Sequence, residues 1–295
     1  MRSEKRETDL KERLDVIGQM EVLDMHTHLV SLSEETKAKE ELALRKIEGI
    51  ASCISTGTPQ EWKFVQKFRE RPEILVSFGI HPWYAGQHLP EHEMEAYCAC
   101  DFIGEIGMDN VWCQVPESVQ RSVFARQLEI AEELHKPVLL HTKGMEREIA
   151  RMLEGFSRPV CIHWYSGTES DLEEYLGKGY FFTIGPDFGA LRRLCLQGEK
   201  GIPTAWNTEE QREKWNLYCK MLKEIPKDRL FVETDGVSAI AWAMGVEETE
   251  LSALSRTLKE NRDAMADTWK ESPQEVKQRM FLNLREFLTA GREEK

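Results

Sequence analysis

The sequence predicts an α/β protein: a TIM-type (β/α)8 barrel that forms a single domain. Eight short runs rich in Val, Ile, Phe and Leu alternate with stretches of helical spacing, a pattern typical of a parallel sheet. The chain has 295 residues, and a barrel of this type takes about 250 residues. No glycine-rich phosphate loop follows the first run, so the alternative, a doubly wound open sheet, is less favoured.

The expected strands end near glycine or polar residues. In chain order they are 22–29, 51–57, 74–81, 101–107, 137–143, 159–166, 179–185 and 229–235. A helix is expected at 117–135, where apolar side chains recur at helical spacing, and another at about 208–224. Residues 186–228 are longer than one crossover needs, which predicts an inserted stretch within about 186–215.

The first 20 residues precede every expected strand and are heavily charged. We expect them to form a helical extension packed on the bottom of the barrel, or to fray, which leaves residues 21–295 for the barrel domain. They lack the apolar stretch of a signal peptide. No run in the chain approaches the roughly 20 apolar residues of a membrane span.

Composition narrows the class of protein further. The hydrophobic fraction of 41% suits a sizeable core, and the formal net charge of −13 argues against a broad basic surface for nucleic acid. The seven cysteines are odd in number, and none has zinc-knuckle spacing. We interpret them as reduced thiols of a cytoplasmic protein.

Metal-competent side chains lie at or near the carboxyl ends of five expected strands. They are His26 and His28 in "DMHTH", Glu105, His141, His163 and Asp235. Alternate residues of a strand share a face, so His26 and His28 point the same way. All strands of a parallel barrel open on one face, where active sites lie. Because buried His, Asp and Glu are costly unless paired, this group is interpreted as a metal site rather than as six separate core polar residues.

Six ligands suggest two ions, because a single catalytic zinc usually takes three protein ligands and a water. His26, His28 and Asp235 suit one ion, His141 and His163 the other, and Glu105 can bridge them. Paired ions of this kind lie about 3.5–4 Å apart, and a shared water loses its proton near neutral pH to become the nucleophile. Asp235 is then the expected general base. The ligand types suit Zn, Mn, Ni and, less well, Mg.

Several ordered motifs together resemble the TatD family of metal-dependent hydrolases, itself similar to the wider amidohydrolase superfamily. They are "DMHTH", "GIHP", "GEIGMD", "KPVLLHTK", "IHWYSG" and "RLFVETD". The resemblance runs from about residue 22 to "NLREFL" at 283–288. It implies a barrel in which the same six side chains hold two divalent ions, and an activity that in many members is that of a deoxyribonuclease.

Further site candidates follow from the same motifs. His81, in "GIHP", ends the third expected strand, and the resemblance implies a role on substrate or attacking water, a structural hydrogen bond being the alternative. Lys143 stands where the family commonly carries an arginine and would meet a phosphate. Glu233 would support a metal ligand or form a packed ion pair.

The aromatic and arginine side chains indicate a function less specifically than the motif residues do. Trp83, with Tyr84, could stack on a base or merely pack its loop. Arg192 and Arg193 would line the barrel mouth or stay solvated on a helix. The remaining histidines, His88, His92 and His135, are expected at the surface.

Three departures from the family pattern all fall at the barrel mouth, where specificity is set. "ETD" continues as "GVSAIAWAMG", Trp83 stands where a histidine is common, and the seventh strand precedes the inserted stretch. The leading hypothesis is a dinuclear hydrolase of phosphate esters, acting on a DNA 3′ end or a small phosphoester. The alternative is the same metal site acting on a carboxylic ester, lactone or amide. A catalytically dead binding protein is less favoured because all six ligands are present, and no obligate protein partner or membrane is expected.

Overall fold

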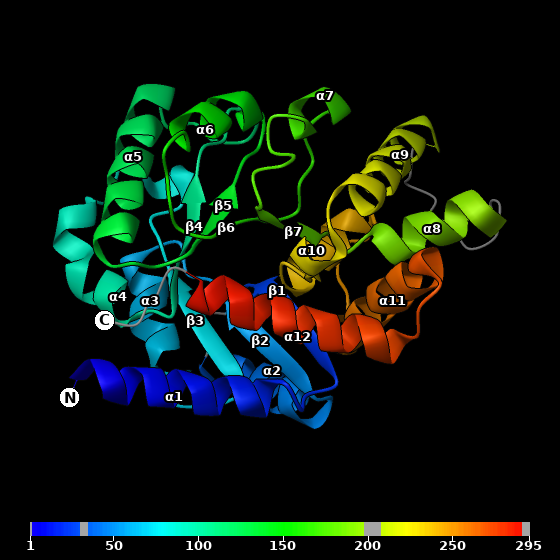
Figure 1. The fold of residues 1–295 in the computed structure, drawn as a ribbon, viewed down its shortest axis with the longest axis horizontal. Coiled ribbons are helices and arrows are strands. Elements are labelled where there is room, and N and C mark those ends of the chain that lie inside the picture. The colour runs from blue at the N-terminus through cyan, green and yellow to red at the C-terminus, as the bar shows by residue number, and fades with distance from the viewer. Residues whose placement is uncertain (1, 30–34, 198–207, 291–295) are drawn as a thin grey trace.

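A computed structural model describes residues 2–29, 35–197 and 208–290 of the chain. Eight parallel strands follow one another in the order β1 to β8, each paired with the next (Figure 1). Their bounds are β1 Val22–Thr27, β2 Ile50–Ile54, β3 Ile74–Phe78, β4 Phe102–Gly107, β5 Val138–His141, β6 Val160–Ile162, β7 Phe181–Ile184 and β8 Leu230–Val232. Every expected strand is present, and each is shorter than predicted.

The sheet curls until its first and last strands meet. The backbone N–H of Asp235 donates to the His26 carbonyl at 3.0 Å. The backbone N–H of Thr234 donates to the Asp24 carboxylate at 2.9 Å. These bonds join the end of β8 to β1 and nearly close the barrel, so the (β/α)8 prediction is confirmed.

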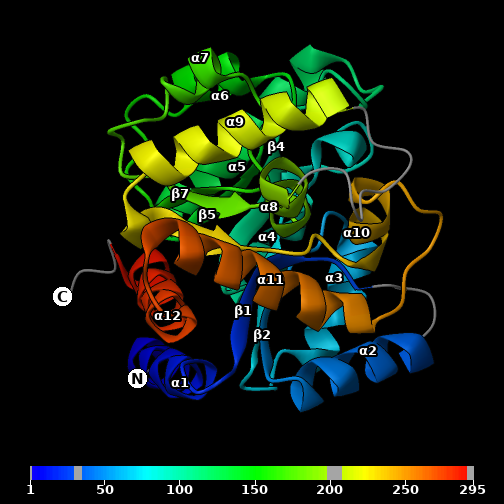
Figure 2. The ribbon, with the colours of Figure 1, turned by 90° about the vertical axis from the view of Figure 1, so that its right-hand side faces the viewer.

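The strands are formed by largely apolar runs, because both faces of each strand are shielded from solvent. Every residue of the eight strands is buried, as expected for a parallel sheet enclosed by helices. Figure 2 shows helices on the outside of the strands. Their bounds are α1 Arg2–Ile17, α2 Glu35–Ile47, α3 Pro59–Val65, α4 Met94–Ala99, α5 Glu117–Glu133, α6 Glu146–Met152, α7 Glu169–Leu172, α8 Phe188–Gln197, α9 Thr208–Glu224, α10 Val237–Ala243, α11 Ser252–Trp269 and α12 Pro273–Thr289.

Local sequence explains where helices begin and what they bury. Helix α12 starts with Pro273 after Ser272, whose hydroxyl accepts from the Glu275 N–H while the Glu275 carboxylate bonds back, a complete capping box. Helix α5 buries the stripe predicted from its spacing, including Val123, Leu128 and Ile130.

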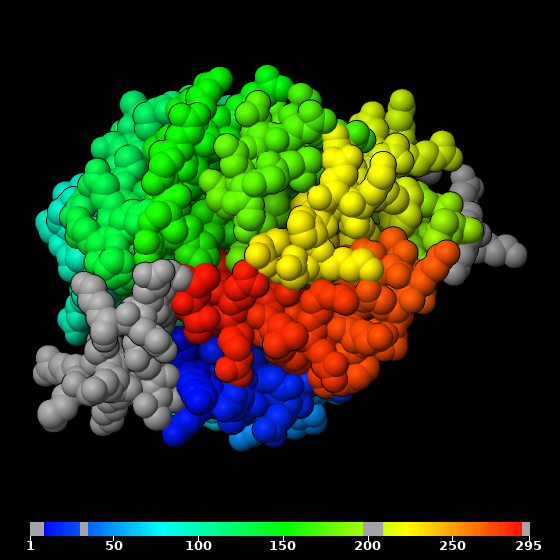
Figure 3. Space-filling model, viewed as in Figure 1, coloured from blue at the N-terminus to red at the C-terminus, as the bar shows by residue number. Residues whose placement is uncertain are grey.

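Helix α1 lies across the amino-terminal ends of the strands (Figure 1). Leu10, Leu14 and Ile17 are buried. The Arg13 guanidinium donates to Asp101, which precedes β4, at 2.7 Å, and to the carbonyl of Ile74, which begins β3. These contacts place the helix on the face opposite the carboxyl ends of the strands. Figure 3 shows α11 and α12 (orange and red) exposed between α1 and α9 on one side of the molecule.

The inserted stretch expected at 186–215 falls partly on residues 198–207, which lie outside the described residues. On either side of that gap stand α8 and α9, which pack through the stacked rings of Phe188 and Trp215, 5.8 Å apart. That residues 21–295 form one domain carrying this insertion remains a prediction. No described helix is both long and apolar enough to cross a bilayer. All seven cysteines are free.

Candidate metal centre

The carboxyl ends of the strands open into a cavity of about 1010 Å³. Five of the six predicted ligands line it, namely His28, Glu105, His141, His163 and Asp235, and His81 joins them. His26 is fully buried just beneath. Four of these residues stand just past their strands: His28 follows β1, His81 follows β3, His163 follows β6, and Asp235 follows β8.

Glu105 occupies the middle of the cluster. Its Oε2 atom lies 3.3 Å from His28 Nε2 and 3.5 Å from His26 Nε2. Its Oε1 atom lies 2.8 Å from both His141 Nδ1 and His163 Nε2. The two carboxylate oxygens therefore face two different pairs of imidazoles.

Irregular strand pairing helps to aim these side chains. The register between β1 and β2 shifts between Asp24 and Thr27, a stretch that includes His26. The register between β4 and β5 shifts between Ile103 and Ile106, a stretch that includes Glu105. Such irregularities redirect side chains at the rims of barrels. Position 107 has space for glycine alone, because a Cβ there would lie 1.9 Å from the His141 carbonyl oxygen.

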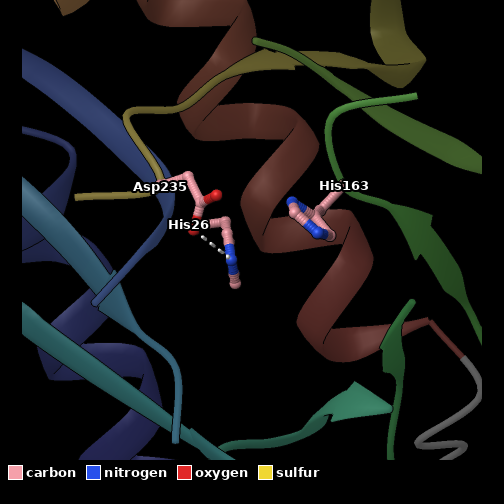
Figure 4. A group of neighbouring side chains, drawn as sticks. All are labelled: His26, His163 and Asp235. Atoms are coloured by element: carbon pink, nitrogen blue, oxygen red, sulfur yellow. Dashed lines mark ion pairs between the residues drawn. The ribbon is translucent and has the colours of Figure 1, made fainter. Parts of the chain in front are cut away.

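Asp235 approaches His26 of β1 from the neighbouring strand end (Figure 4). Its Oδ1 atom lies 3.2 Å from His26 Nε2 and 3.6 Å from His28 Nε2. The residue adopts a positive φ of 53°, a left-handed conformation uncommon outside glycine but tolerated by aspartate. This turn directs the carboxylate toward His26 although β8 has already ended.

The two ring nitrogens of His26 are arranged as in a metal ligand. Nδ1 bonds the Ser55 hydroxyl at 2.9 Å, whereas the buried Nε2 makes no aligned hydrogen bond and faces the oxygens of Asp235 and Glu105 at 3.2 and 3.5 Å. An imidazole held through one nitrogen and open at the other is the usual arrangement of a metal ligand. Three overlapping sets bring ligand atoms within 4.8 Å of one another: His26, His163 and Asp235; His26, His28 and Glu105; His81, Glu105 and His141.

The side chains of the cluster shift one another's pKa values strongly. Burial alone would raise the pKa of Glu105, but the surrounding imidazoles, His163 foremost, hold it well below its usual range. Burial opposes protonation of His28, but its contacts with Glu105 and Asp235 outweigh this and raise its pKa to about 9. Burial and the nearby His163 lower the pKa of His26 to about 4. Glu105 is thus ionised at neutral pH and carries a negative charge that can offset bound cations.

Asp109 is a site residue that the sequence reasoning missed. Its Oδ2 atom lies 3.2 Å from His141 Nε2 and accepts from Trp83 Nε1 at 2.8 Å. Its Oδ1 atom accepts from the backbone N–H groups of Val111 and Trp112, both at 2.8 Å. Asp109 thereby fixes the His141 ring. The available signal was its place in "GEIGMD", directly after β4.

Glu233 lies behind the cluster. Its Oε1 atom is 3.4 Å from His163 Nδ1, and burial raises its pKa to about 7. This placement suits the expected support of a metal ligand.

The other candidates divide between the cavity and the surface. Lys143, Trp83 and Tyr84 line the cavity. Arg192 does not: α8 turns it toward α11, where it pairs with Asp267 at 3.2 Å. Its neighbour Arg193 pairs with Glu260 of the same helix. Arg192 is thus absent from the described lining of the cavity, and its contribution to substrate binding stays a prediction. None of His88, His92 and His135 lines the cavity.

The sequence was compared with families of known proteins. The model of the TatD related DNase family matches residues 23–289. The chain belongs to this family. It is 24% identical to the uncharacterized metal-dependent hydrolase YabD of Bacillus subtilis, over 72% of this chain and 79% of the relative. It is 30% identical to the 3′-5′ ssDNA/RNA exonuclease TatD of a Rahnella strain, over 63% of this chain and 67% of the relative.

Solved structures show the same fold. The TatD homologue YJJV of Escherichia coli K12 superposes with a TM-score of 0.68 at 18% identity, over 92% of this chain and 98% of that one. A TatD family hydrolase of Entamoeba histolytica gives a TM-score of 0.65 at 14% identity, over 91% and 98%. The predicted family and barrel are confirmed, and the chain is a metal-dependent hydrolase of the TatD type.

Proposed function

We propose that this TatD protein is a dinuclear metal hydrolase that cleaves phosphodiester bonds at the 3′ end of DNA. The observation that carries the proposal is the position of Glu105, which turns one oxygen toward His26 and His28 and the other toward His141 and His163. A carboxylate between two imidazole pairs is the arrangement that bridges two cations. Asp235 completes the ligands on the His26 side.

Two divalent ions held there would supply a Lewis acid for a phosphate oxygen and lower the pKa of a bound water. Asp235 is then placed to accept a proton, because it lines the cavity and is ionised at neutral pH. His81, whose Nε2 lies 3.4 Å from Glu105 Oε1, reaches the same space from β3. It would contact the substrate or the attacking water.

Lys143 would hold the phosphate. It lines the cavity two residues after His141 and donates to the Ser166 hydroxyl at 2.9 Å. As a point charge it would neutralise one phosphate without fixing its orientation, as the fork of an arginine would.

A DNA end is favoured over an internal site because the ligand cluster lines a cavity of an acidic protein rather than a broad basic surface. Relatives named 3′-5′ ssDNA/RNA exonuclease support this choice of substrate. The alternative, an uncharged ester, lactone or amide, is favoured by four carboxylates on the cavity lining: Glu61, Glu169, Glu210 and Glu213.

Substrate panels separate the two candidates. The protein is stripped of metal, reloaded separately with Zn, Mn, Ni or Mg, and assayed on chromogenic phosphodiester, phosphomonoester, lactone and amide substrates. We expect the phosphodiester to turn over fastest. Faster lactone or amide turnover, abolished in Asp235→Asn, would instead establish the alternative.

A further inference from the structure

Three tryptophans from distant parts of the chain meet in the cavity beside the metal centre. Trp112, Trp164 and Trp242 all line it. The Trp242 ring lies 5.7 Å from the Trp112 ring and 5.7 Å from the Trp164 ring, in both cases edge to face. We call these three residues the tryptophan wall.

Two members of the wall, Trp112 and Trp164, are held by backbone hydrogen bonds next to the metal centre. The N–H of Trp112 donates to Asp109, the same carboxylate that fixes His141. Trp164 directly follows His163, has a positive φ of 35°, and donates its N–H to the Thr183 hydroxyl at 2.7 Å. Gly185 leaves the space for this indole, because a Cβ there would lie 2.1 Å from Trp164 Nε1. Trp112 and Trp164 are therefore fixed relative to the predicted ligands, and Trp242 contacts both rings.

The wall leaves much of its aromatic surface open. Trp242 is 61% exposed and Trp112 is 46% exposed. Large aromatic side chains contribute most when buried, and exposed apolar surface that lines a cavity marks a place for a ligand. Trp242 lies on α10, the segment that departs from the family pattern after "ETD".

Two lysines lie on the ring faces of the other members. Lys143 Nζ is 4.7 Å from the centre of the Trp112 ring, and Lys214 Nζ is 5.3 Å from that of Trp164. Lys143 therefore contacts the wall while standing two residues from His141. A ligand with a phosphate at the metal centre and a flat ring joined to it would meet both groups.

We propose that the tryptophan wall is a stacking subsite for the nucleobase of the nucleotide at the scissile bond. This inference deepens the proposed function and rests on it for the choice of a nucleobase as the ring. Aromatic side chains bind bases through the π-face that every base presents, with little preference for sequence. The subsite holds the terminal nucleotide by its base, while Glu210 and Glu213 on the α9 side of the cavity repel further phosphates.

The first test measures binding without turnover. Saturation-transfer NMR on the purified full chain compares thymidine with its abasic analogue, the tetrahydrofuran nucleoside. We expect binding of thymidine alone, kept in Trp242→Phe and lost in Trp242→Leu, which preserves apolar bulk without the ring. Leu282→Ala, an exposed apolar position on α12, is the control and should bind like the wild type. Equal thymidine signals in Trp242→Leu and the wild type would overturn the subsite.

The second test measures cleavage of two oligodeoxynucleotides that differ only in having a base or an abasic residue at the last two 3′ positions. Stacking predicts a preference for the base-containing end of roughly 5- to 150-fold. The ratio of the two rates should fall toward one in Trp112→Ala and Trp242→Leu, whereas Leu282→Ala should keep both the wild-type ratio and the wild-type abasic rate. Cleavage with no preference, together with absent thymidine binding, overturns the subsite and leaves the nuclease. Thymidine binding that requires the Trp242 ring, with no DNA cleavage, supports the subsite and overturns the nuclease.

Discussion

At the scale of single residues, the proposed metal centre is built around one carboxylate among five imidazoles. Glu105 contacts His26, His28, His81, His141 and His163. In the proposed dinuclear centre, a carboxylate surrounded in this way would compensate charge for both ions. Each ion would have its own histidines, whereas Glu105 would be shared by both.

Glu105→Gln should therefore weaken both ions together. The amide keeps the shape but removes the shared negative charge, whereas His163→Ala should mainly empty one position. Calorimetric titration with Zn and metal analysis of the dialysed proteins would measure both. Wild-type stoichiometry and affinity in Glu105→Gln would contradict the bridging role.

Asp235→Asn should impair turnover more than metal binding or folding. The change keeps the volume and one oxygen atom but removes the proton acceptor, and loss of a general base costs about 10²- to 10⁴-fold in rate. The measurement is kcat on the chromogenic phosphodiester, with the unfolding temperature as the check on folding. Activity within a few-fold of wild type would assign the proton to another group.

At the scale of elements, the closure of the barrel depends on a buried arginine. Arg45 of α2 donates to Asp24 of β1 at 2.8 Å, to Glu41 at 2.8 Å and to the Thr27 hydroxyl at 2.7 Å. Asp24 in turn accepts from Thr234, just after β8. The network therefore spans the β1–β8 seam, which carries both His26 and Asp235.

Arg45→Met should destabilise the fold strongly, because it leaves the buried Asp24 carboxylate without its cation. Removing one partner of a buried pair costs about 3–5 kcal/mol. Arg285→Met is the control: it breaks an exposed pair with Asp15 and should change stability little. Urea unfolding of both variants measures the difference, and equal midpoints would show that the network does not hold the seam.

The elements themselves were predictable, while their ends were less so. Long apolar runs mark buried strands, and all eight appear. The runs do not reveal that β8 stops at Val232, because the apolar pattern cannot show the left-handed turn that carries Asp235. Nor do they reveal the register shifts around His26 and Glu105.

Polar residues near strand ends were predicted as a group because barrel topology brings strand ends together. Asp109 was missed because its partner, His141, is 32 residues away. The sequence left two placements open for Arg192, because helical phase after a strand end decides whether a side chain faces the cavity or α11. The tryptophan wall combines residues from three separate segments of the chain, so no local sequence pattern predicts it.

At the scale of the whole molecule, an acidic protein would bind an anion through a small cationic pocket. Two divalent ions would bring four positive charges, of which Glu105 and Asp235 offset two, leaving about +2. Arg192 and Arg193 are paired with α11 and add nothing to the pocket. Few phosphates can then be contacted, which predicts weak binding and a shallow salt dependence of roughly 0.7 per phosphate on single strands.

The most direct measurement of the central claim is a time course with the metal-loaded protein on linear and covalently closed circular single-stranded DNA of the same sequence. A dinuclear centre at the bottom of a cavity should trim the linear strand from its 3′ end, release mononucleotides and leave the circle intact. Rapid cutting of the circle would contradict end-trimming, and an intact linear strand with every metal tested would contradict nuclease activity altogether.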